Sequence, residues 1–406
     1  MSAPPDLERI ERIELGLREA GLDALVCALP SNVLLLSGYW PVVGTSVAVA
    51  TRDGTVGLVV PADEQDLAKA GWADVMEVMP AASLAELTPM VEVLAPAFQR
   101  CLRRMGAGHG RIGFERGPML EPSSYAGTNR YATALSDLLP DCCPNAVMVG
   151  ADDVLLDLRA TLTTRELASV RTACCVAEDA FRAGAGCIRP AATEREIAAA
   201  FRAPLAAFAD AYGEASARAG GFLFCMSGPN AALADRAYAR TRGRRIRSAD
   251  LVMVHCNSFV NGLWTDITRT YYPGPADDGT RALFDAVLAA RRAALEAIGP
   301  GVRAREVDRA AREVLIGHGF GPQFRHGAGH GVGFAAIDHN ARPRLHPASD
   351  DVLEAGMVFN VEPAVYLDGI GGIRHCDLVA VHADRAELLT PFHSRLEELA
   401  PRLAAA

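Results

Sequence analysis

The feature that most restricts how this chain can fold is an Asn261-Gly262 pair between two apolar, β-branched segments, residues 252–260 and 263–270. Both central positions of a type I′ turn need a positive φ, which asparagine and glycine adopt more readily than other residues. The sequence therefore predicts a β-hairpin with a two-residue loop at this place.

The expected register of this hairpin collects polar side chains on one strand face. With a two-residue loop Val260 pairs with Leu263, so that Asn257 lies opposite Asp266. Side chains alternate along a strand with a period of two, which places His255 diagonal to Asp266 on the same face. One metal ion could reach all three side chains. We expect Asn257 to hydrogen-bond near such an ion rather than to ligate it.

The composition fits a globular protein of about two domains that does not bind nucleic acid. The chain has 406 residues, of which 50% are hydrophobic and 22% charged, and its formal net charge is −9. It has no apolar run of about 18 residues, no secretory signal and no lipidation motif. We therefore expect a cytoplasmic protein that does not associate with membranes.

Cysteine and lysine usage narrows the classes of cofactor. The ten cysteines include the adjacent pairs Cys142-Cys143 and Cys174-Cys175 but no CxxC spacing, which is typical of reduced cytosolic thiols. Lys69 is the only lysine, and this scarcity removes a P-loop lysine and any Schiff-base or PLP chemistry that needs one. The cofactor classes that remain centre on metal ions.

Hydrophobic periodicity divides the chain near residue 155 into a first domain, 1–155, and a second domain, 156–406. The first domain is expected to be α/β, with a helix and several strands joined by short turns. The glycine cluster at 106–110 is interpreted as a plain loop, because no GxGxxG motif opens a helix there. The predicted elements are a helix over 7–20 and strands over 25–29, 44–50 and 56–60.

A polar turn near 150–153 leads into the second domain, whose first helix is expected to start at Thr163. Thr163 is a predicted N-cap, Glu166 supplies early acidic charge, and the helix is expected to run to about Ala183. Helices and strands then mix without a βαβ rhythm, so the fold class is α+β. The later elements predicted are helices over 194–212, 278–298 and 304–318, and glycine-rich strands that end near Val381.

Six separated motifs of the C-terminal half occur in an order that resembles a known family. They are Ser227-Gly-Pro-Asn230, Thr265-Asp-Ile-Thr-Arg-Thr270, Ile298-Gly-Pro-Gly-Val302, His326-Gly-Ala-Gly-His-Gly331, Gly356-Met-Val-Phe-Asn-Val-Glu-Pro363 and Gly371-Gly-Ile-Arg374. With them the chain resembles the creatinase, prolidase and aminopeptidase P superfamily, the pita-bread metallohydrolases. The segments Ser31-Asn-Val33 and Leu36-Ser-Gly-Tyr39 also resemble the creatinase-type N-terminal domain.

This resemblance implies a fold, an oligomeric state and a metal site. It implies a pita-bread catalytic domain after a creatinase-like α/β domain, in a homodimer where one subunit's N-terminal domain borders the other's pocket. In such enzymes two Asp, one His and two Glu hold two divalent ions that share a water or hydroxide. Asp266, His330 and Glu362 match three of these ligands, but His255 and Cys376 stand where relatives have the first Asp and the last Glu.

The resemblance also implies proton-handling and substrate-binding residues. The first histidine of the His-x-x-x-His pair is His326, and His339 replaces, by a short insertion, a histidine that relatives carry at the position of Ile337. We expect His326, His339 and Glu362 to act in catalysis. Asp235 stands where many relatives carry a Pro-His pair that contacts the substrate. The residues expected to bind the substrate are Asp235, Arg374 and Tyr39.

Charge favours one metal ion over two. Four carboxylates balance two divalent ions, whereas Asp266, Glu362 and a Cys376 thiolate carry at most three negative charges, with His255 neutral. Thiolate and imidazole donors also favour Zn²⁺ or Fe²⁺ over Mn²⁺ or Co²⁺. We therefore expect a single zinc or iron ion. The ligands expected for it are His255, Asp266, His330, Glu362 and Cys376.

Simpler interpretations of three of these residues stay open. Cys376 could be a small buried apolar side chain, because free cysteine is among the most buried residue types. His255 could be a hydrogen-bonded core histidine, and Asp235 a turn residue.

The function expected is that of a metal-dependent hydrolase that cleaves an amide or other C–N bond of a small molecule or short peptide. Ordinary Xaa-Pro cleavage is not expected, because the two-ion cluster that binds the free amine has lost two carboxylates. Two alternatives stay open: a creatinase-like or lyase-type enzyme that cleaves C–N or C–S bonds, and a noncatalytic binding module.

Overall fold

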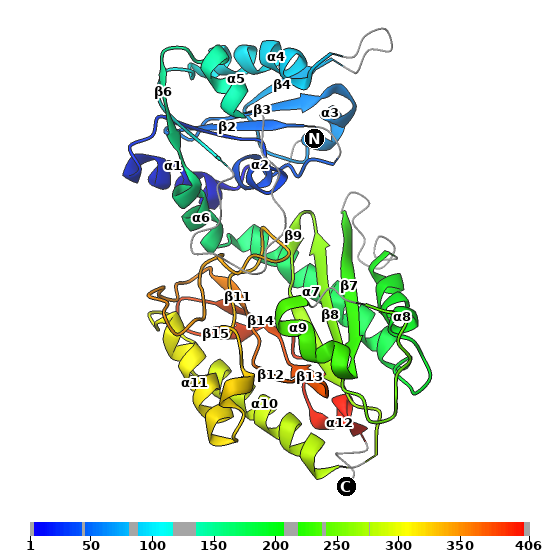
Figure 1. Cartoon of the computed structure of the whole chain (residues 1–406). Helices are drawn as coiled ribbons and strands as arrows, with labels where there is room; N and C mark the ends of the chain where they lie inside the picture. The colour runs from blue at the N-terminus through cyan, green and yellow to red at the C-terminus, as the bar shows by residue number, and fades with distance from the viewer. Residues whose placement is uncertain are drawn as a thin grey trace. The chain divides into compact units, whose positions relative to one another are not determined.

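The computed structural model describes residues 4–42, 45–80, 88–116, 135–206, 218–237, 241–275 and 277–401 (Figure 1). Among these residues two compact units occur, one that ends at Arg159 and one that begins at Ala160. No helix within the described ranges is both long enough and apolar enough to span a membrane.

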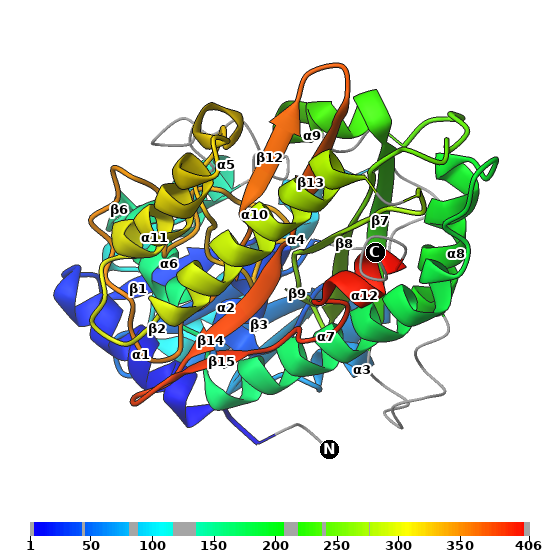
Figure 2. The same ribbon diagram turned by 90° about the horizontal axis from the view of Figure 1, so that it is seen from below.

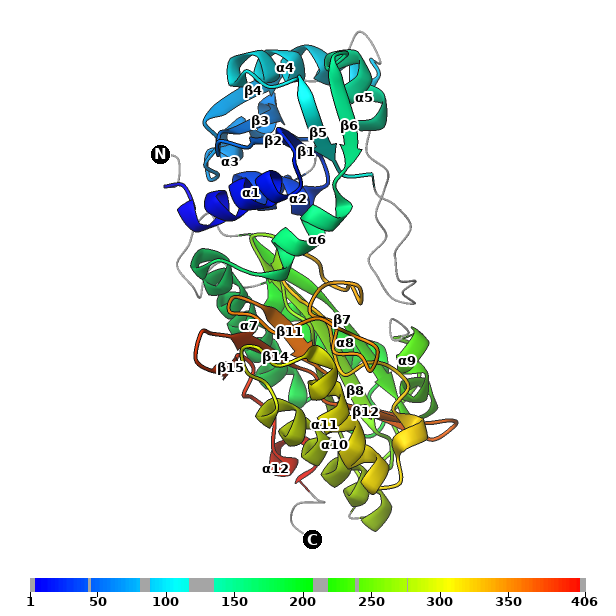
Figure 3. The same cartoon turned by 90° about the vertical axis from the view of Figure 1, so that its left-hand side faces the viewer.

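The first unit is built on a mixed six-stranded sheet with the strand order β4-β3-β2-β1-β5-β6. Helices α4 and α5 cover one face of this sheet, and α1 and α2 lie on the other (Figure 3). Phe98 and Leu138 from the first pair of helices share one apolar core with Val26 and Val49 of the sheet. The elements are α1 (Leu7–Glu19), β1 (Ala24–Cys27), α2 (Pro30–Ser37), β2 (Val47–Thr51), β3 (Val56–Pro61), α3 (Gln65–Ala68), β4 (Val75–Met79), α4 (Met90–Met105), β5 (Gly110–Phe114), α5 (Leu135–Cys142), β6 (Ala146–Gly150) and α6 (Asp152–Ala160).

Local sequence signals predicted most of the early elements of this unit. The helix expected over 7–20 is α1, and the strands expected over 25–29 and 56–60 overlap β1 and β3. The strand expected over 44–50 is β2, which begins at Val47; Gly44 lies outside the described residues. Helix α2 was not predicted, although Pro30 stands in its first turn and Gly38 ends it with a left-handed φ of 69°.

The second unit contains two pairs of helices and three small sheets. The pair α7 and α8 packs against β7 and β8, whereas α10 packs against β11, β12 and β13. Helix α11 lies beside α10 (Figure 2). The sheets have the orders β10-β8-β7, with β9 paired to β8, β11-β14-β15 and β12-β13. The elements are α7 (Thr164–Ala185), α8 (Glu194–Ala206), β7 (Ala219–Ser227), η3 (Gly228–Leu233), α9 (Ala234–Ala237), β8 (Val252–Val260), β9 (Leu263–Trp264), β10 (Ile267–Tyr271), α10 (Asp278–Glu296), α11 (Ala304–Gly317), η4 (Gly321–Gln323), β11 (Val358–Val361), β12 (Ala364–Leu367), β13 (Gly371–Arg374), β14 (Asp377–Val381), β15 (Ala386–Leu388) and α12 (Leu396–Leu399).

The helix predicted to start at Thr163 is confirmed by a capping box. The Thr163 hydroxyl accepts a hydrogen bond from the Glu166 backbone N–H at 3.3 Å, and the Glu166 carboxylate accepts one from the Thr163 N–H at 2.9 Å. Two backbone N–H groups that the first turn of α7 leaves without helical partners are satisfied in this way. Helix α8 is described only as far as Ala206, so the predicted continuation to Tyr212 lies outside the described residues.

The predicted hairpin is confirmed in loop, conformation and register. Asn261 and Gly262 have φ values of 50° and 85°, and Val260 pairs with Leu263. The same register continues into β10, where Thr268 pairs with His255. The hairpin therefore presents the face expected from the sequence.

An isolated bridge joins this hairpin to the C-terminal strands, because Thr268 also pairs with Cys376. A second bridge, between Gly331 and Phe359, joins the glycine-rich segment before β11 to that strand. These two bridges bring together parts of the chain that are far apart in sequence, and the candidate site lies where they meet.

Candidate active site

Strand ends and loops of the second unit bring together a group of acidic, basic and imidazole side chains. Apart from His339, which is half-buried, each of them is buried. They are His255 on β8, Asp266 between β9 and β10, His326, His330 and His339 between η4 and β11, Glu362 between β11 and β12, Arg374 at the end of β13, and Cys376 between β13 and β14.

Asp266 lies beside three of the residues predicted as metal ligands. Its carboxylate oxygens are 3.6 Å from Nδ1 of His255 and 3.7 Å from Nε2 of His330. The sulfur of Cys376 lies 3.7 Å from Oδ1 of Asp266, and its S–H donates to the Asp266 backbone carbonyl at 3.1 Å. Both substituted positions, His255 and Cys376, therefore face the retained acid.

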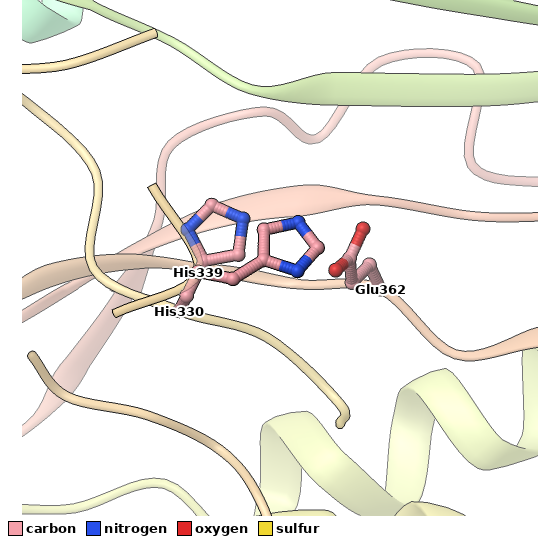
Figure 4. Close-up of side chains that lie close together, drawn as sticks. All are labelled: His330, His339 and Glu362. Carbon is pink, nitrogen blue, oxygen red and sulfur yellow. The ribbon is translucent and has the colours of Figure 1, made fainter. Parts of the chain in front are cut away.

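A candidate metal cluster is formed by His330, His339 and Glu362. One ligand atom from each of these side chains lies within 4.8 Å of the other two (Figure 4). The rings of His330 and His339 stack, with centroids 4.5 Å apart and planes inclined by 28°. Two predicted ligands thus occur together with His339, which the sequence suggested as a proton-handling residue.

His330 is held in a tautomer suited to metal binding. Its Nδ1 lies 3.0 Å from the Gly331 carbonyl, which can only accept, so Nδ1 carries the proton and Nε2 keeps the lone pair. The Asn360 side-chain NH2 donates to this Nε2 at 3.2 Å, a neutral donor that an ion bound at Nε2 would displace, and the Asn360 oxygen accepts the His330 backbone N–H at 2.7 Å. A ligating histidine typically has its second nitrogen fixed by a carbonyl in this manner.

The acids of the site fit a bound cation. Burial raises the pKa of both Asp266 and Glu362, and Arg374 opposes that rise at each of them. Two carboxylates buried side by side are costly unless positive charge compensates them. Together with the Nε2 lone pair of His330, they form a donor set of the kind that holds a divalent ion.

His326 is neutral and its hydrogen bonds define its tautomer. Burial lowers its pKa to about 3, and the nearby Arg374 lowers it further. Its Nδ1 donates to the Gly327 carbonyl at 2.7 Å, so Nε2 accepts from the Tyr366 hydroxyl at 3.0 Å. Tyr366 is a site residue that sequence reasoning missed, because a tyrosine on a short apolar strand resembles a core residue.

Arg374 lies among these groups and carries their permanent positive charge. Its Nη1 is 3.8 Å from Glu362 and 3.5 Å from the Tyr366 hydroxyl. Burial disfavours the charged form, yet Tyr366, Glu362 and the other surrounding acids raise the pKa of Arg374 above its ordinary value. This guanidinium, predicted to bind substrate, also interacts with the acids that would hold a metal.

A row of aromatic side chains extends from His255 along the hairpin sheet. Phe224 pairs with His255 across the strands and stacks on its ring at 6.2 Å. Phe222 lies 5.7 Å from Phe224 and 5.6 Å from Trp264, and all three aromatic rings are half-buried. Asn257, across from Phe222, donates to the Ala336 carbonyl at 2.8 Å and so ties the sheet to the segment that carries His339.

Two predicted substrate-binding residues make other contacts. Asp235 lies 3.5 Å from Arg325, which also pairs with Asp368 at 3.0 Å. Tyr39 belongs to the first unit, where its buried hydroxyl donates to the carboxylate of Glu64. The substrate roles of both residues stay predictions.

Comparison with known proteins identifies relatives over nearly the whole chain. The model of metallopeptidase family M24 matches residues 168–383, and that of the creatinase/prolidase N-terminal domain matches residues 9–161. An Xaa-Pro dipeptidase of Pyrococcus furiosus is 27% identical over 393 residues, which cover 94% of this chain and 97% of the relative. A probable dipeptidase PepE of Mycobacterium tuberculosis is 33% identical over 272 residues, 65% of this chain and 69% of the relative.

Solved structures of prolidases are also similar to this chain over nearly its whole length. A prolidase from Pyrococcus horikoshii OT3 superposes with a TM-score of 0.74 at 26% identity, covering 94% of this chain and 98% of the other. The prolidase of Pyrococcus furiosus gives a TM-score of 0.72 at 27% identity, covering 93% and 98%.

Proposed function

This chain belongs to metallopeptidase family M24 and carries the creatinase/prolidase N-terminal domain, and on that premise we propose that it hydrolyses the amide bond of short peptides with a single divalent ion. Membership confirms the predicted resemblance, the α+β class and the pita-bread fold. It also confirms that the enzyme is a metallohydrolase of the M24 type with a divalent metal cofactor. The number and identity of the ions are our proposal.

The single-ion proposal rests on the position of Arg374. This guanidinium lies beside Asp266 and Glu362, the two carboxylates that remain of the four expected to hold metal ions. With an ion bound, Asp266 and Glu362 would contribute two negative charges, and Arg374 contributes one positive charge. Burial raises the pKa of the Cys376 thiol well above its usual value, so this residue adds no charge by itself. One divalent ion with one further anion, either a hydroxide or the Cys376 thiolate, then makes the site neutral, whereas a second ion would leave buried positive charge unbalanced.

We propose that Asp266, His330 and Glu362 hold this ion. Cys376 is close enough to Asp266 to add a sulfur ligand once its proton is lost, which favours zinc or iron over manganese or cobalt. His339 lies within the same cluster of ligand atoms as His330 and Glu362. For His255 we propose a different role below.

The roles of the protein groups follow from their protonation. A divalent ion bound here would supply Lewis acidity toward the scissile carbonyl and toward a water molecule. Glu362, whose pKa burial raises, is suited to accept the proton of the attacking water. Burial lowers the pKa of His339, so this neutral imidazole is proposed to relay to the leaving nitrogen the proton that Glu362 takes from the water. His326 instead orients the Tyr366 hydroxyl, because both of its ring nitrogens already make hydrogen bonds.

The proposed substrates are short peptides with an apolar side chain. The half-buried ring surfaces of Phe222, Phe224 and Trp264 supply an apolar wall beside His255. Several relatives are named Xaa-Pro dipeptidases, yet we propose that Xaa-Pro turnover is weak here, since two carboxylates expected to hold a second ion are replaced. The homodimer and a domain division near residue 155 also remain proposals.

Metal analysis combined with a dipeptide panel tests this function. The purified protein, loaded with Zn²⁺, Fe²⁺ or Mn²⁺ and dialysed, is analysed for metal by mass spectrometry, and each form is assayed on dipeptides with and without proline in second place. We expect one zinc or iron per chain and faster cleavage of substrates that lack proline. Two manganese ions per chain together with rapid Xaa-Pro cleavage would refute the proposal.

A further inference from the structure

We propose that His255 is a positioning residue rather than a metal ligand: it holds the Arg374 guanidinium as the fixed second cation of the site. This inference rests on the single-ion function proposed above and explains how the site manages without a second ion. Both residues are buried in the second unit, on β8 and at the end of β13.

Neighbouring side chains surround the Arg374 guanidinium. Nη2 of Arg374 lies 3.2 Å from Nδ1 of His255, and Nε lies 3.2 Å from the Thr268 hydroxyl. Nη1 lies 3.5 Å from the Tyr366 hydroxyl and 3.8 Å from the Glu362 carboxylate. Each nitrogen of the group therefore has a neighbour, and the planar group is held in one orientation with an edge toward Glu362.

Arg374 and His255 can share a hydrogen bond in only one direction. A guanidinium has only donors, so a hydrogen bond across the 3.2 Å contact requires Nδ1 of His255 to accept. The Thr268 hydroxyl lies 2.9 Å from the same Nδ1. A neutral imidazole has one acceptor nitrogen, and its other nitrogen carries the hydrogen. Once Nδ1 accepts from Arg374, the neutral ring has no lone pair left for an ion.

Histidine and aspartate differ at this position in the number of lone pairs that they offer. A carboxylate has about four lone-pair sites and can accept from an arginine while it ligates a metal. The imidazole can do only one of the two. Replacing aspartate by His255 therefore removes a ligand and a negative charge, while it keeps the acceptor that Arg374 needs.

The Arg374 guanidinium would repel metal ions bound next to it. A divalent ion near Asp266 and Glu362 lies close to the guanidinium as well, because Arg374 contacts Glu362 directly. Like charges repel strongly at a buried site, where water screens them little. Arg374 thus shares the two acids with one ion and disfavours another.

Nitrogen NMR on protein labelled with ¹⁵N-histidine tests the tautomer directly, with and without added Zn²⁺. His255→Asn identifies the His255 signals by their loss. We expect His255 to be neutral, with hydrogen on Nε2, and its shifts to change little when zinc is added. Hydrogen on Nδ1, or a zinc-induced shift typical of a ligating nitrogen, would overturn the inference.

Two substitutions of Arg374 test its role as a cation. Arg374→Met removes the charge, and Arg374→Lys, the matched control, keeps it. Calorimetric titration with Zn²⁺ should give a Kd at least about tenfold lower for the methionine variant, and a nearly unchanged Kd for the lysine variant. Equal effects of both substitutions would contradict a charge role. If the methionine variant does not fold, the NMR result on the wild-type chain still decides.

These measurements separate the inference from the proposed function. A wild-type protein that binds one zinc through a ligating His255 keeps the function but refutes the role given to this residue. A protein that binds two ions while His255 still accepts from Arg374 refutes the single-ion function instead.

Discussion

The thiol of Cys376 donates to the backbone carbonyl of Asp266, with Sγ 3.1 Å from the oxygen, and the same sulfur lies 3.7 Å from Oδ1 of that residue. The bridge between Thr268 and Cys376 sets this geometry, because it places the residue after β13 beside the hairpin. In this arrangement the thiol keeps its proton, and only a cation near Asp266 would favour the thiolate.

The first prediction concerns the number of ions. The double variant His255→Asp with Cys376→Glu restores two carboxylates, so it should bind two Mn²⁺ ions per chain where the wild type binds one. Mass spectrometry of the dialysed protein measures this number. His255→Asn with Cys376→Gln is the matched control, because it changes the same positions without adding charge, and it should stay at one ion. If the acidic variant also stays at one, these positions do not set the metal count.

The second prediction concerns stability and pH in the metal-free protein. Because burial raises the pKa of Asp266 and Glu362, their contribution to stability is present at low pH and is lost as the pH rises through the raised pKa values. The melting temperature of the metal-free wild type should therefore fall more steeply with rising pH than that of Glu362→Gln, because the glutamine side chain has no proton to lose. Added Zn²⁺ should remove the difference. If the melting temperatures of the wild type and of Glu362→Gln change equally with pH, this prediction is wrong.

Sequence reasoning predicted the parts of the site that local rules determine. The Asn-Gly turn fixed the hairpin register, and with it the face shared by His255 and Asp266. Motif spacing pointed to the segment that carries His330, which the structure places 3.7 Å from Asp266. The two acids and this histidine could be named before any coordinates, because each belongs to a short motif.

The contacts that define the role of Arg374 could not be predicted, because they depend on pairing between distant segments. Its neighbours His255 and Tyr366 come from β8 and β12, and no local pattern places three such strands together. The role of Tyr366 also depends on contacts with residues distant in sequence, Arg374 among them, so the sequence did not reveal it. The tautomer of His326 depends on a backbone carbonyl, whose direction the sequence does not specify.

The third prediction concerns Tyr366. Tyr366→Phe removes the hydroxyl that donates to His326 and lies next to Arg374, so kcat should fall by about tenfold to a hundredfold while metal binding persists. Steady-state kinetics and metal analysis measure the two effects. Tyr271→Phe is the control, since it removes a buried hydroxyl that contacts His393 instead. A similar loss of kcat in both variants would indicate a general effect of the lost hydroxyl.

The fourth prediction concerns the apolar wall. Phe222→Ala removes a ring that contacts both Phe224 and Trp264, so KM for dipeptides with a large apolar side chain should rise by about tenfold. The KM for a glycine-containing dipeptide should change little, because such a substrate has no side chain to bury there. Measuring both substrates on the same protein preparation provides an internal control for misfolding. Equal changes in KM would place the apolar side chain of the substrate away from this row of aromatic residues.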